Sequence, residues 1–415
     1  MLKSKTTTKN KNMLQRICDG LKTEPEQLKS TWYSYITDAI TLPLRIITYP
    51  LRAGAMWAIA PATRWNIEDT VKDYKNEDTK STLRKIASTT KQAIFLNDKF
   101  AIQKIKYTIP RNKNCEMIMA MNHKNPEQDI SKRKLVITVS GNGILPEECI
   151  LSLKDIDNIN NDVLAIGFPK NATSSAELVD ATVSAMLRAK QAGYEIENIK
   201  VTGHSLGGAI TALALQKVQE YLEPNKKFAE YVNHKSFTNL GNVVTGLMSS
   251  GKTLESQTDQ SIEDQNKADI ELYKQSNSSF LSKFMNGLAW LLGVQLNAVD
   301  AFKSTLPVEK IKIITAEADK VIHESAAIKN AIQQNQYNIT FETVNTEHND
   351  IDDKLFLGHN EYTKNKFFLA LGDEYFQQIL SNEQKKLKIA LTNQTIEAQL
   401  PIETGDRRKR MSIDI

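Results

Sequence analysis

Several residue types and patterns that define other protein classes are scarce or missing in this sequence. Only three of the 415 residues are cysteines, Cys18, Cys115 and Cys149. They are too few and too widely spaced for a disulfide framework or a cysteine metal site, and they suit a reducing compartment. No window holds the roughly 20 uncharged apolar residues that a membrane-spanning helix requires. The basic N-terminus is followed by no apolar run and no small-residue cleavage site, so we expect no Sec-type signal peptide.

A surplus of charge of either sign is also missing. Lysine and arginine number 53, aspartate and glutamate number 49, and the net charge is +4. This balance does not indicate a nucleic-acid partner. The sequence contains no HExxH, no CxxC and no GxGxxG after a strand-like run. We therefore expect no metal, no dinucleotide and no other cofactor.

The residues that are present are those of an ordinary globular protein, with 40% hydrophobic and 25% charged residues. Two strand-like runs, 100–109 and 114–122, are joined by a short turn-forming segment and predict a hairpin. Strand-like and helix-like runs then alternate. The predicted strands are 134–143, 162–169, 196–203, 231–240, 309–319 and 337–345, and the predicted helices are 174–194, 209–222 and 366–380. This order predicts an α/β fold, a mostly parallel sheet with helices on both faces.

The composition changes along the chain and predicts three regions. Residues 1–95 form a helical N-terminal extension, of which about the first 30 residues are polar and expected to begin loosely ordered. Residues 96–382 form the main domain, and its alternation is interrupted by an insert at about 241–307. Residues 383–415 form a charged, flexible tail.

Two apolar additions have two readings each. The stretch 32–65 is rich in aromatic residues but interrupted by Pro and Arg, so it forms either broken helices that cover the main domain or a segment that rests on a membrane. The stretch 280–302 is an apolar helix or helical hairpin, broken at Gly287 and Gly293, that either packs on the core or faces lipid. Peripheral membrane contact through these two stretches is therefore one prediction.

One heptapeptide carries the chemistry. In GHSLGGA, the residues Gly203, His204, Ser205 and Gly207 satisfy G-x-S-x-G, and a predicted strand precedes them while a predicted helix follows. This context is that of a nucleophile elbow, a turn so tight that its glycines must lack side chains. Ser205 would then project from the end of the strand, next to a helix N-terminus that favours developing negative charge.

The elbow, with the hairpin before it, resembles the α/β-hydrolase fold and its lipase and esterase branch. The resemblance covers residues 100–380 by pattern, and only the elbow is specific. It implies a serine hydrolase whose insert at 241–307 forms a helical cap over the site. A looser resemblance is to lipase-like effectors that intracellular bacteria such as Legionella inject, which also lack a Sec-type signal.

The resemblance also implies the partners of Ser205, because the triad of this fold runs in the order Ser, Asp or Glu, His. The acid follows the strand before the last, where Asp319 stands, with Glu317 as the alternative. Two of the six histidines follow the last strand, His359 and His348, and we favour His359 as the base. The other four stand too early in the chain or before the last strand: His123, His204, His234 and His323.

The oxyanion donors implied by the resemblance are backbone N–H groups. One is that of Leu206, directly after the nucleophile. The other is that of Asn142 in the loop SGNG after the third strand of the family's sheet, where this chain has Ser140 in place of the usual histidine.

We therefore expect a hydrolase of carboxylic esters, lipid-like ones first: a lipase, phospholipase or carboxylesterase that forms an acyl-enzyme on Ser205. The alternatives are a thioesterase and a non-catalytic protein of the same fold that binds a host protein or a membrane. We expect the protein in the cytoplasm or translocated as an effector, with peripheral membrane contact as a further prediction.

Overall fold

The computed structural model describes residues 2–28, 48–56, 58–74, 76–89, 94–96, 99–109, 113–124, 129–142, 144–153, 160–249, 271–272, 274–316, 322, 326–332 and 339–344. The chain divides into two units, Met1–Leu371 and Gly372–Ile415, and every described residue belongs to the first. The predicted helix 366–380 and the predicted tail 383–415 lie outside the described residues.

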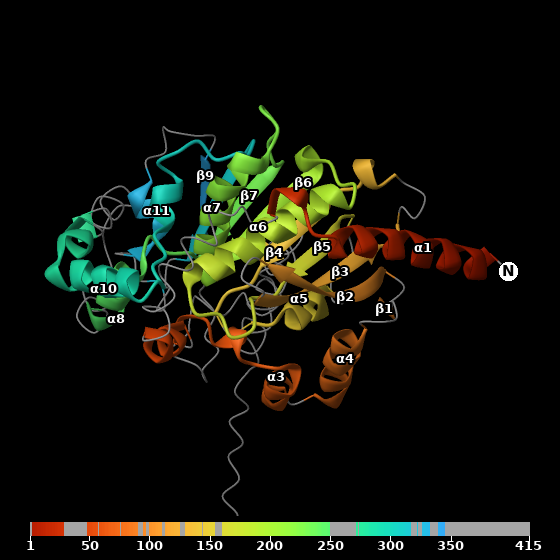
Figure 1. Cartoon of the computed structure of the whole chain (residues 1–415), viewed down its shortest axis with the longest axis horizontal. Helices are drawn as coiled ribbons and strands as arrows, with labels where there is room; N and C mark the ends of the chain where they lie inside the picture. Colours follow the sequence, from red (N-terminus) through yellow and green to blue (C-terminus); the bar gives the residue numbers. More distant parts are fainter. Residues whose placement is uncertain are drawn as a thin grey trace, which may run out of the picture. The chain divides into compact units, whose positions relative to one another are not determined.

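The described residues form one nine-stranded sheet in the order β1-β2-β3-β5-β4-β6-β7-β8-β9 (Figure 1). The strands are β1 (Ile94–Leu96), β2 (Phe100–Ile109), β3 (Lys113–Asn122), β4 (Leu135–Val139), β5 (Asp162–Ile166), β6 (Ile199–His204), β7 (Glu230–His234), β8 (Ile311–Ala316) and β9 (Ile339–Val344). The pairs from β1 to β5 are antiparallel, and those from β5 to β9 are parallel. The predicted hairpin and parallel sheet are confirmed, whereas β1 is an additional edge strand that the sequence reasoning missed.

Six of the described helices pack in two groups, and three others lie in the insert between β7 and β8. They are α1 (Leu2–Lys22), α3 (Ile67–Asp73), α4 (Glu77–Ser88), α5 (Pro146–Ser152), α6 (Ser175–Gln191), α7 (Leu206–Val218), α8 (Leu240–Ser249), α10 (Phe280–Leu291) and α11 (Ala298–Ala301). Helices α1, α6 and α7 form one group, and α3, α4 and α5 form another beside β2, β3 and β5. Every side chain of β4 and β5 is buried, and successive strand residues point to opposite faces, so both faces of the sheet are covered there.

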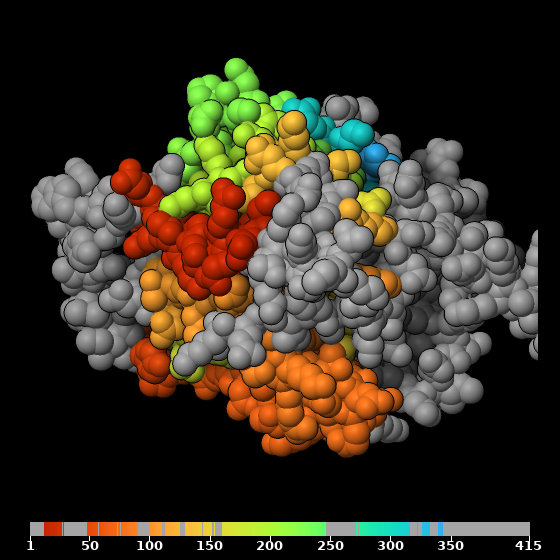
Figure 2. All heavy atoms as spheres, turned by 90° about the vertical axis from the view of Figure 1, so that its right-hand side faces the viewer, coloured from red at the N-terminus to blue at the C-terminus, as the bar shows by residue number. Residues whose placement is uncertain are grey.

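We expected the chain to begin loosely ordered, but Leu2–Lys22 form helix α1. Its residues Leu14, Ile17, Cys18 and Leu21 are all fully buried, and their spacing of three and four residues places them on one helical face. Arg188 of α6 holds the end of α1, because its guanidinium donates to the carbonyls of residues 21, 22 and 23 at 2.8–3.0 Å. Figure 2 shows α1 in red on the surface, with the orange α3–α4 segment below it.

The insert between β7 and β8 contains α8, α10 and α11, and residues 271–272 and 274–278 are also helical. Helix α10 runs through Gly287 without interruption, so the predicted break at this glycine is wrong. The helix ends before Gly293, whose φ of +68° suits a glycine that terminates a helix. No close contact requires glycine at position 287, since a Cβ there would meet no atom within 4 Å.

Candidate active site

The predicted nucleophile stands at a strained turn between β6 and α7. Ser205 has φ 51° and ψ −119°, a backbone conformation that residues with a side chain rarely adopt. Such a conformation costs about 1–3 kcal/mol and persists only where the surroundings enforce it. The serine occupies the N-cap position of α7, yet its side chain makes no capping hydrogen bond. The geometry is that of the nucleophile elbow predicted from the sequence.

The glycines of the turn are explained by close backbone contacts. A Cβ at Gly203 would lie 2.3 Å from the carbonyl oxygen of Gly207, and a Cβ at Gly207 would lie 2.2 Å from that of Val139. A Cβ at Gly208 would lie 2.6 Å from the Cβ of Ser236. Because most of these neighbours are backbone atoms, no rotamer change could relieve the overlap. The packing of β6, β4 and α7 therefore requires glycine at these places.

The adjacent strand β7 supports the elbow. The amide of Ser205 donates to the carbonyl of His234 at 2.9 Å, and the strand register places His204 beside His234. The Nδ1 atoms of these two buried imidazoles are 2.8 Å apart. One ring must donate and the other accept across that contact, so at least one of them is neutral. This contact between two histidines adjoins the turn at Ser205, and the sequence analysis did not predict it.

The predicted oxyanion loop touches the elbow. A Cβ at Gly141 would lie 2.9 Å from Cδ2 of His204 and 3.3 Å from Cβ of Ser205. Asn142, the next residue, is exposed, whereas Leu206 is buried at the start of α7. The fold thus brings together the two segments that carry the predicted donors. The roles of Asn142 and Leu206 stay predictions, and Gly143 lies outside the described residues.

The remaining triad residues, Asp319, His348 and His359, lie outside the described residues, as do the alternative acid Glu317 and His323. The strands that precede them are described. β8 ends at Ala316 and β9 at Val344, and both run parallel to β7 and β6. Carboxyl ends of parallel strands meet at one edge of a sheet, and Ser205 stands at that edge. The assignment of acid and base stays a prediction.

The sequence analysis missed one motif. Residues 246–253, GLMSSGKT, match the spacing GxxxxGKS/T of a phosphate-binding loop. Such a loop follows a strand and opens a helix, but Gly246 lies inside helix α8. The context of a phosphate-binding loop is therefore missing at the described part of this motif.

In the part of the chain that the structure describes, no group of three or more His, Cys, Asp or Glu side chains is arranged to hold a metal ion. Within the same residues, no helix is both long and apolar enough to cross a membrane.

The fold and the turn together define a class of protein. A mostly parallel sheet entered through an antiparallel hairpin, with a strained serine between a central strand and a helix, is the α/β-hydrolase fold. Within it, residues 151–233 match the family model of lipase, class 3. The matched segment runs from α5 to β7 and contains the elbow. No curated protein matches the chain.

Solved structures similar to this chain are esterases of low sequence identity. An esterase from Pyrobaculum calidifontis is 14% identical, with a TM-score of 0.40 over 79% of this chain and 94% of that one. Esterase B from Lactobacillus rhamnosis is also 14% identical, with a TM-score of 0.40 over 80% and 97%. An esterase from Pyrococcus furiosus is 11% identical, with a TM-score of 0.39 over 67% and 91%.

Proposed function

We propose that this protein is a serine hydrolase of carboxylic esters with Ser205 as the nucleophile. The observation that carries the proposal is the strained backbone of Ser205, which stands between β6 and α7 with the loop at Gly141 packed against it. The match of residues 151–233 to the lipase family model supports an ester hydrolase.

The proposed reaction has two halves. Oγ of Ser205 attacks the ester carbonyl carbon while the base, His359 or alternatively His348, takes the hydroxyl proton. Asp319 holds the imidazole and stabilises its charged form, and the amides of Leu206 and Asn142 bind the oxyanion. The base returns the proton to the leaving alcohol, and the acyl-enzyme remains. In the second half, the base takes a proton from water, which attacks the carbonyl carbon of the acyl-enzyme. The carboxylic acid is released, and the base returns the proton to Oγ of Ser205.

Labelling with a fluorophosphonate probe tests the nucleophile. The wild-type protein should label, and Ser205→Ala should lose labelling and about 10⁶-fold of ester hydrolysis. Ser88→Ala, at an exposed serine at the end of α4, is the matched control and should behave as wild type. Labelling that survives in Ser205→Ala, or a wild type that never labels, would instead support a non-catalytic protein of the same fold.

Separate substitutions assign the other triad members. We expect His359→Ala to abolish hydrolysis, His348→Ala to leave it intact, and Asp319→Asn to lower it about 10⁴-fold. Intact hydrolysis in His359→Ala would transfer the role to His348. If His359→Ala and His348→Ala both kept full hydrolysis, the proposed triad would be refuted. Matched oxygen esters and thioesters of equal acyl length separate an esterase from a thioesterase.

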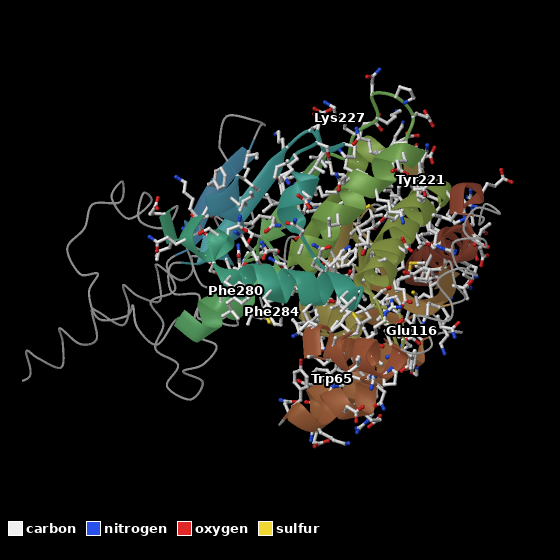
Figure 3. The ribbon with its side chains drawn as sticks, turned by 60° about the vertical axis from the view of Figure 1, so that its left-hand side comes forward. Trp65, Glu116, Tyr221, Lys227, Phe280 and Phe284 are labelled. Atoms are coloured by element: carbon white, nitrogen blue, oxygen red, sulfur yellow. The ribbon has the colours of Figure 1, made fainter. Side chains whose placement is uncertain are left out.

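We further propose that the substrate is lipid-like, because α10 has its apolar face outward. Its inner side carries Ser282 and Asn286, which hydrogen-bond to Asn242 and Asn239 of the α8 segment at 2.6 and 3.0 Å. The exposed side carries large apolar residues (Figure 3): Phe280, Phe284, Leu288, Trp290 and Leu291, of which Phe280 is 84% exposed.

The second predicted apolar stretch reaches the C-terminal end of α10. Arg52 donates from Nε to the carbonyl of Leu292 at 3.1 Å, and its neighbours Tyr49 and Leu51 are exposed. Aromatic residues with a basic residue nearby are typical of a surface that rests on a membrane interface. This supports peripheral contact through the described parts of stretches 32–65 and 280–302.

Flotation with phosphatidylcholine vesicles tests this contact. Burying a Phe side chain is worth about 1.5–3 kcal/mol, so the double variant Phe280→Ser/Phe284→Ser should lower vesicle binding by more than about tenfold. Lys310→Ser, at an exposed lysine outside both stretches, is the control and should bind as wild type. Equal binding of both variants would refute the proposal. Substitution is preferable to removing residues 1–65, because α1 buries core residues.

The place of action is a further proposal: the cytoplasm of the producing cell or, as for the effectors that it loosely resembles, a second cell. A reporter fusion that is active only in a host cytosol distinguishes the two.

A further inference from the structure

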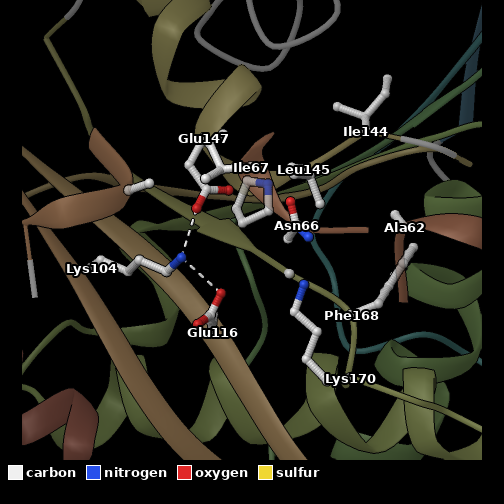
Figure 4. A pocket seen from close by; sticks show the side chains of 13 residues that line it. Ala62, Asn66, Ile67, Lys104, Glu116, Ile144, Leu145, Glu147, Phe168 and Lys170 are labelled. Carbon is white, nitrogen blue, oxygen red and sulfur yellow. Dashed lines mark hydrogen bonds and ion pairs between the residues drawn. The ribbon is translucent and has the colours of Figure 1, made fainter. Parts of the chain in front are cut away.

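A cavity of about 230 Å³ lies beside the carboxyl end of β5, and Ser205 is not among its lining residues (Figure 4). Strands β2 and β3, the N-terminal part of α5, the α3–α4 segment and the chain after β5 all contribute to its wall. The charged residues of its lining are Lys104, Glu116, Glu147 and Lys170. This space is large enough for a small ligand.

One side of the cavity is acidic. Nζ of Lys104 lies 2.7 Å from Oε1 of Glu147 and 2.8 Å from Oε2 of Glu116, so one cation is shared by two carboxylates. Burial by itself would lower the pKa of Lys104, but the two carboxylates outweigh it and the pKa is raised. Glu147 is 2% exposed, and its second oxygen accepts no hydrogen bond from the described residues. The lining residues on this side therefore carry a net charge of −1, and the exposed Lys106, which is not part of the lining, lies 3.9 Å from Oε1 of Glu116.

The other side is basic. Nζ of Lys170 donates one hydrogen bond, to the backbone carbonyl of Trp65, and among the described residues no carboxylate is within ion-pair distance of it. Burial lowers the pKa of Lys170, although Glu116 and Glu147 oppose this effect. In Figure 4, Lys170 lies apart from the Lys104 pair and extends toward Asn66. A half-buried ammonium that has one hydrogen bond and no counter-ion among the described residues favours an anionic group of a ligand.

We propose that this cavity binds a small zwitterion, with the ligand's ammonium at Glu147 and Glu116 and its carboxylate at Lys170. The charges of the wall sum to zero but are separated, so a ligand of single charge would meet repulsion at one side. A zwitterion with opposite ends would satisfy both. Ile67, Leu145 and Phe168 also line the cavity and offer apolar contact to a short aliphatic spacer. An amino acid with terminal amino and carboxyl groups has this chemistry.

Isothermal titration of the full chain tests the proposal with β-alanine, γ-aminobutyrate and 5-aminovalerate as ligands. Butyrate and butylamine, each with one of the two charges, are the controls. We expect saturable one-to-one binding of at least one amino acid and at least about tenfold weaker binding of both single-charge controls. Affinity should fall as pH rises, because Lys170 must be protonated to pair with the carboxylate.

Three variants locate the site. Lys170→Met and Glu147→Gln should each weaken binding at least about tenfold. Ile144→Trp, which fills the cavity from a half-buried position and changes no charge, should also abolish it. Lys310→Met, at an exposed lysine outside the cavity lining, is the control and should bind as wild type. Circular dichroism verifies that each variant is folded.

Three results would overturn the proposal: butyrate binding as tightly as the amino acids, unchanged binding in Lys170→Met, or no saturable binding of any amino acid up to about 10 mM. Ser205→Ala should bind the zwitterion normally, so this test is independent of the proposed hydrolase activity.

Discussion

Replacing Gly207 by alanine should damage both the fold and the chemistry at the elbow. The added Cβ would lie 2.2 Å from the carbonyl oxygen of Val139 and 2.4 Å from that of Ser140. Ordinary contact begins near 3.4 Å, so the backbone would have to separate by about 1.2 Å (3.4 − 2.2). Both neighbours are backbone atoms at the end of β4, a fully buried strand, and neither can move alone.

The expected cost follows from this overlap. Overpacking of a core by one methyl group costs about 1–3 kcal/mol where side chains can adjust, so we expect at least about 3 kcal/mol here. A displacement of about 1 Å at a catalytic group lowers its rate about 100-fold, and the amide of Leu206 adjoins Gly207. The variant should therefore unfold several degrees lower and label with fluorophosphonate at least about 100-fold more slowly.

Gly287→Ala is the matched control. This glycine lies inside α10, and a Cβ there would meet no atom within 4 Å. The change should leave labelling unaltered and stabilise the protein by about 0.5–1 kcal/mol, since alanine is the better helix former. Thermal unfolding and labelling rates of the two variants are compared with wild type. If Gly207→Ala behaved like Gly287→Ala, the close approach of β4 to the elbow would not be what requires glycine.

Three further predictions concern the rest of the molecule. Lys104→Met should lower the free energy of unfolding by about 3–5 kcal/mol near neutral pH, because the buried carboxylate of Glu147 and the half-buried one of Glu116 lose their shared cation. The folded state raises the pKa of Lys104, so wild type should keep this advantage below the lysine's ordinary pKa of 10.5 and lose it at higher pH, measured by urea titration. Asp162→Asn should cost about 3–5 kcal/mol, since Arg133 holds this buried carboxylate with two hydrogen bonds at 2.5 and 2.6 Å; thermal unfolding measures the loss. Burial raises the pKa of Cys18 and of Cys115 to about 12, so iodoacetamide near pH 8 should modify them only in urea, as read by mass spectrometry.

The order of strands and helices after residue 100 could be predicted because each element carries its own pattern. β4 and β5 read as continuous apolar runs, and they are buried on both faces. A helical extension was predicted for residues 1–95, but the order of α1 at its start was not, because polar residues dominate its composition, although Leu14, Ile17 and Leu21 already stand at helical spacing. The predicted break at Gly287 was wrong because a single exposed glycine weakens a helix without ending it.

By itself, the sequence determined the elbow, since strand, glycines, serine and helix are contiguous and their geometry is local. Tertiary structure alone decided what surrounds it. The pairing of His204 with His234 depends on the register of β6 and β7, and the contact of Gly141 with the elbow depends on β4 lying beside β6. The Lys104–Glu147 pair joins residues 43 positions apart. Such contacts depend on which segments the sheet brings together, and no local pattern records that.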